Sequence, residues 1–315
     1  MWRTRGLTIV AAMLHSPPSP VAIRAPIVRG STELLMVVAD PVVQVKAPQA
    51  YNLVFARCGI DAVAVPAHVR SAHLRAFVHE AMALGNLRGL VVSIPHKTPL
   101  MQILHRFDAA ALAAGAVNAV RRDAEGALEG ALFDGLGFIG ALAHHGFAVR
   151  ARRALLLGAG GAGLAIASAL AATGLGELAV FDTDFERAGA LVRRVAPAPA
   201  RVVAQADPAG FDLIVNATPL GLRAGDPLPL NPDRVAPDAV VVDILMTDEP
   251  TALLQALRAR GVTAFSGHEM LVQQMPAYLD FFGFPTAAAA LRGGLPGLMP
   301  ELRAALGGTE TLVRP

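Results

Sequence analysis

The chain has 315 residues, a formal net charge of +2 and 54% hydrophobic residues, enough material for two modest domains. The near balance of 27 basic and 25 acidic side chains gives no sign of a nucleic-acid partner. One cysteine, Cys58, excludes an intrachain disulfide and a cysteine-built metal site, and no metal cofactor is expected.

Residues 1–29 differ in composition from the rest of the chain, because their four arginines are matched by no acidic residue. The apolar run at 7–14 is too short to cross a bilayer, so no membrane association is expected. A basic start followed by a proline-rich stretch resembles an export signal, but no convincing small-residue cleavage site comes after it. We therefore expect a flexible N-terminal extension and a cytoplasmic protein.

From residue 30, short apolar runs alternate with amphipathic stretches. The pattern predicts strands at 34–39, 62–65 and 90–94, and helices at 48–58, 71–84 and 99–107. The segment 116–131 is typical of a hairpin that turns at Glu125-Gly126. This order predicts an α/β domain with a mixed sheet.

A second alternation begins at Arg153. It predicts strands at 154–157, 178–182, 213–216 and 240–244, with helices ending near 172, 195 and 260. The run 196–200 is interpreted as a loop within this domain. Beyond Gly267 we expect helices interrupted at Pro276, Pro285 and Pro296. The second domain is therefore expected to be α/β as well.

A glycine loop opens the second domain. Gly158-Ala159-Gly160-Gly161-Ala162-Gly163 fits G-x-G-x-x-G and lies between a predicted strand and a helix, the context that gives this pattern its meaning. Asp182 follows nineteen residues later, where a carboxylate accepts hydrogen bonds from an adenosine ribose. No arginine stands beside Asp182 in the sequence, so NAD is favoured, with NADP as the alternative.

Lys46 and Lys97 are the two lysines of a chain that otherwise uses arginine. A lysine amine can lose its proton when buried, whereas an arginine stays charged. A retained lysine is therefore a candidate acid or base. Alone, either lysine is better explained as a solvated surface residue, so the argument depends on the neighbouring motifs.

Those motifs occur in the order found in one enzyme family, and the chain resembles the shikimate/quinate dehydrogenases over nearly all of residues 30–283. The matching segments, with the family pattern in parentheses, are Ser93-Ile94-Pro95-His96-Lys97 (T-x-P-H-K), Gly115-Ala116-Val117-Asn118 (G-A-V-N), Phe133-Asp134-Gly135 (T-D-G), the glycine loop, Asn216-Ala217-Thr218-Pro219-Leu220-Gly221 (N-A-T-P-x-G) and Met270-Leu271-Val272-Gln273-Gln274 (M-L-x-x-Q). The resemblance implies reversible NAD(P)-dependent hydride transfer between a secondary alcohol of a cyclic hydroxy acid, shikimate or quinate, and its 3-dehydro ketone. It also implies a role in aromatic amino acid biosynthesis.

The resemblance assigns a substrate-binding and catalytic domain to 30–132, completed by helices of 267–315, and a Rossmann-type dinucleotide-binding domain to 133–266. Lys97 and Asp134 would form the catalytic pair, which suits the proton and positive charge that a developing alkoxide needs. His96 is expected to be structural. Substrate contacts would come from Ser93, Asn118 and Gln274. Cofactor contacts would come from Gly158, Ala159, Gly160, Gly161, Ala162, Gly163, Asp182, Thr183, Asn216, Thr218, Met246 and Gly267.

Several residues depart from the family pattern. The two serines of its first loop, S-x-S-P, are Val45 and Ala47 here, and Val91 and Leu132 replace two asparagines. Lys46 stands between the missing serines. We hypothesise that Lys46, in a loop conformation, makes a charge-assisted hydrogen bond to the substrate carboxylate, with Gln44 as a further polar contact.

Two alternatives remain open. In the first, the same hydride chemistry serves a different, less hydroxylated carboxylate, which the lost polar residues favour. A ligand-sensing homologue without turnover is the second alternative, although a sensor has no chemical reason to keep both the Lys97–Asp134 pair and the glycine loop. The composition is compatible with either a monomer or a homodimer.

Overall fold

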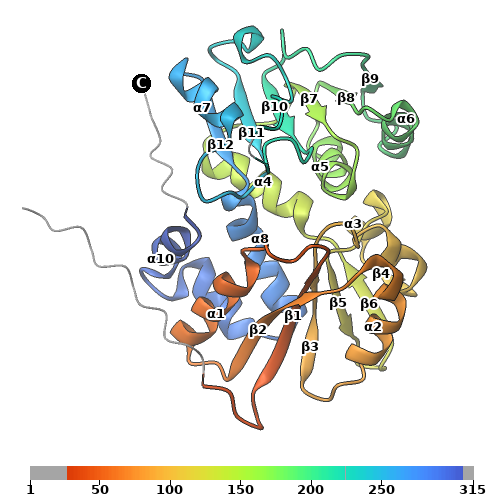
Figure 1. The fold of residues 1–315 in the computed structure, drawn as a ribbon, viewed down its shortest axis with the longest axis vertical. Coiled ribbons are helices and arrows are strands. Elements are labelled where there is room, and N and C mark those ends of the chain that lie inside the picture. Colours follow the sequence, from red (N-terminus) through yellow and green to blue (C-terminus); the bar gives the residue numbers. More distant parts are fainter. Residues whose placement is uncertain (1–26, 224, 308–315) are drawn as a thin grey trace, which may run out of the picture.

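The computed structural model describes residues 27–223 and 225–307. Two six-stranded sheets form two lobes, one above the other, with the long helices α4 (Asp134–His144) and α8 (His268–Phe281) lying between them (Figure 1). The predicted α/β class with two sheets is confirmed. Most of the expected 1–29 extension lies outside the described residues. Among the described helices, none combines the length and apolarity needed to cross a membrane.

The first lobe has a mixed sheet with strand order β2-β1-β3-β5-β6-β4. Strands β1 to β3 run parallel, and β5 pairs antiparallel with both β3 and β6. The strands are β1 (Glu33–Ala39), β2 (Ala62–His68), β3 (Leu87–Val92), β4 (Arg106–Phe107), β5 (Ala119–Arg122) and β6 (Leu128–Ala131). The helical segments are α1 (Ala47–Cys58), η1 (Ser71–His73), α2 (Leu74–Ala81), η2 (Pro99–Gln102) and α3 (Ala109–Ala114).

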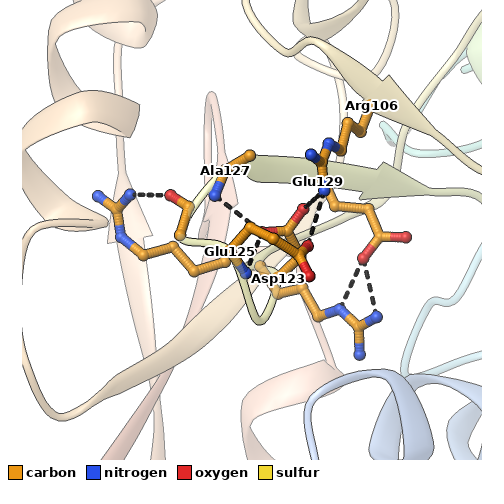
Figure 2. Close-up of polar contacts among 8 residues, drawn as sticks. Arg106, Asp123, Glu125, Ala127 and Glu129 are labelled. Atoms are coloured by element: carbon orange, nitrogen blue, oxygen red, sulfur yellow. Dashed lines mark hydrogen bonds and ion pairs between the residues drawn. The ribbon is translucent and has the colours of Figure 1, made fainter.

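The β5–β6 hairpin is confirmed, and its turn is held by a polar network (Figure 2). Asp123 accepts hydrogen bonds from the backbone N–H of Ala127 (2.8 Å) and of Glu125 (3.1 Å). Arg106 on the edge strand β4 pairs with Asp123 and, at 2.9 Å, with Glu125. The network therefore joins the hairpin turn to the neighbouring strand, and Arg121 pairs with Glu129 across the hairpin (2.8 Å).

The second lobe has an all-parallel sheet with strand order β12-β11-β10-β7-β8-β9. Its strands are β7 (Arg153–Leu157), β8 (Glu177–Phe181), β9 (Ala200–Val202), β10 (Leu213–Asn216), β11 (Val240–Asp243) and β12 (Thr263–Ser266). Its helical segments are α5 (Gly161–Ala172), α6 (Phe185–Arg194), η3 (Pro232–Arg234) and α7 (Ala252–Ala259). Leu155, Leu156 and Leu157 are fully buried, as expected for a parallel strand that is covered on both faces.

The chain returns to the first lobe through α8 and ends with three shorter helical segments, α9 (Pro285–Ala289), η4 (Ala290–Gly294) and α10 (Leu298–Ala305). Residues of α8, α9 and α10 share one hydrophobic core with β1 and α1. Tyr51, Phe55 and Phe282 are among the fully or almost fully buried side chains of this core. The C-terminal helices therefore complete the first lobe, and α8 runs from the junction of the two lobes into the first lobe (Figure 1).

Two sequence-based expectations for the elements are wrong, and three elements were not expected. The expected helix at 99–107 is the short turn η2 followed by β4, and α3, β9 and β12 were not expected. Asp108 accepts a hydrogen bond from Ala111 N (2.7 Å) and starts α3, which ends at Gly115 in a left-handed conformation (φ 69°). Pro276 does not interrupt α8. Burial of α8 between the lobes outweighs the one backbone hydrogen bond that a proline removes.

Candidate functional site

A cavity of about 190 Å³ opens between the two lobes, where β1 and β3 end and α4 and α8 begin. Seven of its lining side chains are polar, namely Gln44, Lys46, Ser93, Lys97, Asp134, Gln274 and Tyr278. The rest of the wall is almost entirely apolar and comes from both lobes. The cavity thus brings together residues that are far apart in the sequence, and all of the polar ones except Tyr278 were predicted from sequence as substrate-binding or catalytic.

The pair Lys97–Asp134 lies in the wall of this cavity. Lys97 ends the loop after β3, and its carbonyl accepts a hydrogen bond from Val117 N (2.9 Å). Asp134 is the first residue of α4, and its carboxylate accepts a hydrogen bond from the Lys97 ammonium. The two side chains are 12% and 5% exposed, so solvent screens their attraction only weakly. The arrangement can hold a proton beside a bound substrate.

Two side chains of this region, His96 and Tyr278, form hydrogen bonds to backbone carbonyls. The His96 ring nitrogen Nε2 bonds the carbonyl of Val69 (2.7 Å) in the buried interior, consistent with the structural role expected for His96. Tyr278 lines the cavity and donates a hydrogen bond to the carbonyl of Asn118 (3.3 Å). Burial, and secondarily the charge of Asp134, holds the pKa of Tyr278 well above its usual value, so the phenol stays protonated.

Of the residues expected to contact the substrate, four line the cavity and one is buried behind its wall. Gln44, Lys46, Ser93 and Gln274 line the cavity. Asn118 is fully buried behind the wall. Its side-chain oxygen accepts a hydrogen bond from Phe133 N (3.0 Å), and its side-chain Nδ2 donates to Gln274 Oε1 (3.5 Å). In this geometry Asn118 orients Gln274 and the start of α4 rather than facing the cavity itself.

Lys46 precedes the first turn of α1 in a helical rather than extended conformation (φ −90°, ψ −15°), which meets the condition that its hypothesised role requires. Its ammonium forms an ion pair with Asp248, a residue of the other lobe. The hydrogen bond from Lys46, reinforced by its charge, lowers the pKa of Asp248. Sequence reasoning missed Asp248, because no motif marks it and only the fold brings it near Lys46.

The glycine loop connects β7 to α5 and has the shape that a dinucleotide requires. A Cβ on Gly163 would lie 2.0 Å from the carbonyl oxygen of Gly158, and one on Gly158 (φ 97°) would lie 2.8 Å from the Ala217 carbonyl. At Gly160 a Cβ would meet no atom within 4 Å, so the loop leaves open space in front of the helix N-terminus. Open space at a helix N-terminus, where backbone N–H groups have no partner within the helix, is the kind of site that can accept a phosphate group.

Asp182 lies just after β8, beside the glycine loop. Its carboxylate accepts hydrogen bonds from Ala159 N and Asp184 N, both at 2.8 Å. Arg187 on α6 approaches Asp182 (3.9 Å) and Asp184 (3.3 Å). The expectation that no arginine stands beside Asp182 is therefore wrong in space, because the first turn of α6 folds back over the strand end. Thr183 lies between these two carboxylates in the chain.

The remaining expected cofactor residues shape the loops after β10 and β11. Asn216 is buried and holds the turn by accepting from Thr218 N (3.1 Å) and donating to Asp243 (3.0 Å). Met246 and Gly267 line the cavity. A Cβ on Gly267 would lie 2.1 Å from the Ile244 carbonyl oxygen, so glycine permits the close approach of two chain segments. Within the described residues, no group of three or more His, Cys, Asp or Glu side chains is arranged to hold a metal ion.

Comparisons with known proteins agree with this geometry. A family model described as the shikimate dehydrogenase substrate binding domain matches residues 37–120. A shikimate dehydrogenase (NADP(+)) of Rubrobacter xylanophilus is 38% identical over 281 residues, which cover 86% of this chain and 98% of that protein.

Solved structures are similar over the same length. A quinate dehydrogenase from Corynebacterium glutamicum in complex with NAD has a TM-score of 0.74 and 27% identity, covering 87% of this chain and 98% of that one. A 5-ketofructose reductase of Gluconobacter sp. strain CHM43 has a TM-score of 0.71 and 26% identity, covering 84% and 99%. Proteins of this shape therefore include one named for quinate and one named for 5-ketofructose.

Proposed function

The chain belongs to the shikimate dehydrogenase family of NAD(P)-dependent oxidoreductases, and from this we propose that it interconverts a cyclic hydroxy acid of the shikimate or quinate type and its 3-dehydro ketone. The observation that carries the proposal is the position of Lys97. This residue is paired with Asp134 in the wall of the cavity, and a Cβ on Gly161 would lie 3.3 Å from the Lys97 Cβ. The closeness of the Lys97–Asp134 pair to the glycine loop supports a catalytic role for the pair and a cofactor-binding role for the loop.

The chain's own residues would handle the proton. A bound nicotinamide supplies the hydride acceptor when the alcohol is oxidised and the hydride donor when the ketone is reduced. In the oxidative direction, the neutral amine form of Lys97 takes the proton of the reacting hydroxyl, and the charge of Asp134 stabilises the ammonium that results. In the reductive direction, the Lys97 ammonium donates that proton to the alkoxide oxygen, and its positive charge favours the developing negative charge.

In this proposal Lys46 binds the substrate carboxylate, while Ser93, Gln44 and Gln274 contact ring hydroxyls. Support comes from their common position in the wall of one cavity. Asn118 would act through Gln274, because its side-chain Nδ2 lies 3.5 Å from Gln274 Oε1. The glycine loop, Asp182, Thr183, Asn216, Thr218, Met246 and Gly267 would form or shape the cofactor site.

The proposal is tested by following NAD(P) reduction with shikimate, quinate and simpler cyclic or aromatic hydroxy acids. Turnover of shikimate or quinate that is lost in Lys97→Ala supports it. Tight cofactor binding without turnover of any hydroxy acid would favour the ligand-sensing alternative instead.

A less hydroxylated carboxylate is the second candidate substrate, because the wall beside the polar side chains is apolar. Val45, Val91 and Met246 line the cavity where hydroxyl or amide groups would hold a polyhydroxylated ring. An apolar wall leaves ring hydroxyls without partners, which costs binding free energy. A kcat/KM for a mono- or dihydroxy ring acid above that for shikimate would select this candidate.

We also propose NAD as the preferred cofactor, although the relative from Rubrobacter xylanophilus is named for NADP(+). Asp182 and Asp184 together present two carboxylates, and Arg187 contacts both, so one positive charge faces two negative ones. A 2′-phosphate would be repelled by this cluster, whereas ribose hydroxyls can donate to it. Comparable kcat/KM values for NAD and NADP would contradict the preference.

Two further parts of the proposal concern the protein in the cell. We propose a cytoplasmic location, because a chain with one cysteine cannot form the intrachain disulfides that are common in secreted proteins. A homodimer is compatible with the composition of the chain. Cell fractionation and sedimentation of the purified protein test these two points separately.

A further inference from the structure

An ion pair bridges the two lobes at the cavity. Lys46 belongs to the first lobe, lines the cavity and has a side chain only 19% exposed. Its partner Asp248 belongs to the loop between β11 and α7 in the second lobe, and its side chain is 89% exposed. The pair is therefore asymmetric, because the Lys46 side chain is partly buried and the Asp248 side chain is almost fully exposed to water.

The loop that carries Asp248 is anchored at its base. Buried Asp243 accepts hydrogen bonds from Thr251 Oγ1 (2.6 Å) and from Asn216 Nδ2 (3.0 Å), which ties the end of β11 to the start of α7. At the tip, the Thr247 hydroxyl donates to the carbonyl of Glu249 (2.6 Å) and closes a turn around Asp248. These hydrogen bonds fix the conformation of the loop that places the Asp248 carboxylate beside Lys46.

We propose that Asp248 is a positioning residue that sets the specificity of the cavity for anionic substrates: its carboxylate neutralises Lys46 in the free enzyme and is exchanged for the carboxylate of the substrate on binding. This inference rests on the proposed role of Lys46 in holding the substrate carboxylate. The reacting end of the substrate would remain at Lys97 and Asp134.

The different exposure of the two side chains favours exchange. Leaving a partly buried ammonium without a partner is unfavourable, so Lys46 is expected to hold a carboxylate in both states. Asp248 returns to water with little cost, because most of its surface is already hydrated. An uncharged ligand cannot replace Asp248 on Lys46, so it gains nothing at this position. Exposed ion pairs contribute little, and the competition is therefore expected to raise KM for the acid by roughly twofold to fivefold.

The test measures KM and kcat for shikimate and quinate, and for the methyl ester of each as an uncharged probe, in Asp248→Asn. We expect KM for the acids to fall roughly twofold to fivefold, with the effect on KM rather than kcat, and KM for the esters to stay unchanged. Asp248→Glu should restore the KM of the unmodified enzyme. Glu249→Gln is the matched control, because it removes the same charge from the same exposed loop without touching Lys46.

Lys46→Met separates this inference from the proposed function. A rise in KM for the acids in Lys46→Met supports the carboxylate role, and the double variant should then match Lys46→Met, because Asp248 acts through Lys46. If Lys46→Met raises KM and Asp248→Asn does not lower it, or lowers it equally for the esters, the exchange is wrong and Asp248 is only a clamp between lobes. If Lys46→Met leaves KM unchanged, the carboxylate role fails, and the exchange fails with it.

Discussion

Replacing Lys97 with methionine removes the ammonium that pairs with Asp134 and keeps a side chain of similar length. Asp134 is then a carboxylate with 5% of its side chain exposed and no cation beside it. Removing one partner of a buried pair costs about 3–5 kcal/mol. We expect the lower value, about 3 kcal/mol, because the pair faces a cavity that water can enter. Since a general acid–base contributes about 10²–10⁴ in rate, kcat should fall by that factor.

Two measurements check this prediction. Steady-state NAD(P) reduction gives kcat, and thermal unfolding should show the melting temperature of Lys97→Met lowered by roughly 6 °C. The double variant Lys97→Met/Asp134→Asn removes both charges, so it should regain most of the stability and none of the activity. A Lys97→Met enzyme that keeps kcat within tenfold would refute the catalytic role. A double variant no more stable than the single one would refute the argument from a buried charge.

Three further predictions concern stability. Burial raises the pKa of Glu269, but hydrogen bonds from Arg303 and Gln273 outweigh this effect and lower the pKa below 4.5. The stabilisation is therefore present above pH 4.5 and is lost as pH falls through the lowered pKa. Glu269→Gln should flatten the dependence of denaturant stability on pH below pH 4.5. Arg194→Gln removes donation to the carbonyls of Ala113 (2.7 Å) and Leu112 (3.1 Å) across the lobes and should cost about 1 kcal/mol in urea unfolding. Tyr51→Phe removes a buried hydroxyl with no partner among the described residues, so the melting temperature should stay equal or rise.

Local sequence patterns predicted much of the fold. The alternation of apolar runs and amphipathic stretches indicated the strands from β1 to β3 and from β7 to β11 apart from β9, since burial on both faces requires continuous apolar residues. Short edge elements such as β4 and β9 carry no such signal. Their strand geometry depends on pairing with a neighbour, as Arg106 and Phe107 of β4 do with Glu129 and Gly130 of β6.

The candidate site divides in the same way. Lys97, Asp134 and the glycine loop were indicated from sequence, because the motifs that contain them combine a required residue type with a required turn. Asp248, Arg187 and the buried position of Asn118 were not. The contact of Asp248 with Lys46 depends on how the two lobes pack. The position of Arg187 depends on how α6 packs beside the end of β8, and that of Asn118 on how the chain just before β5 packs beside the start of α4.

The identities of the acid, the base and the flexible glycines are properties of residues and their immediate neighbours, so the sequence carries them directly. Which charged side chains pair at the cavity depends instead on the distances between residues of the two lobes. The sequence around Lys46 indicates no partner for its charge, but folding places it beside Asp248, 202 residues away along the chain. Electrostatic energy depends on separation and on solvent exposure, and both exist only after the two sheets have packed against α4 and α8.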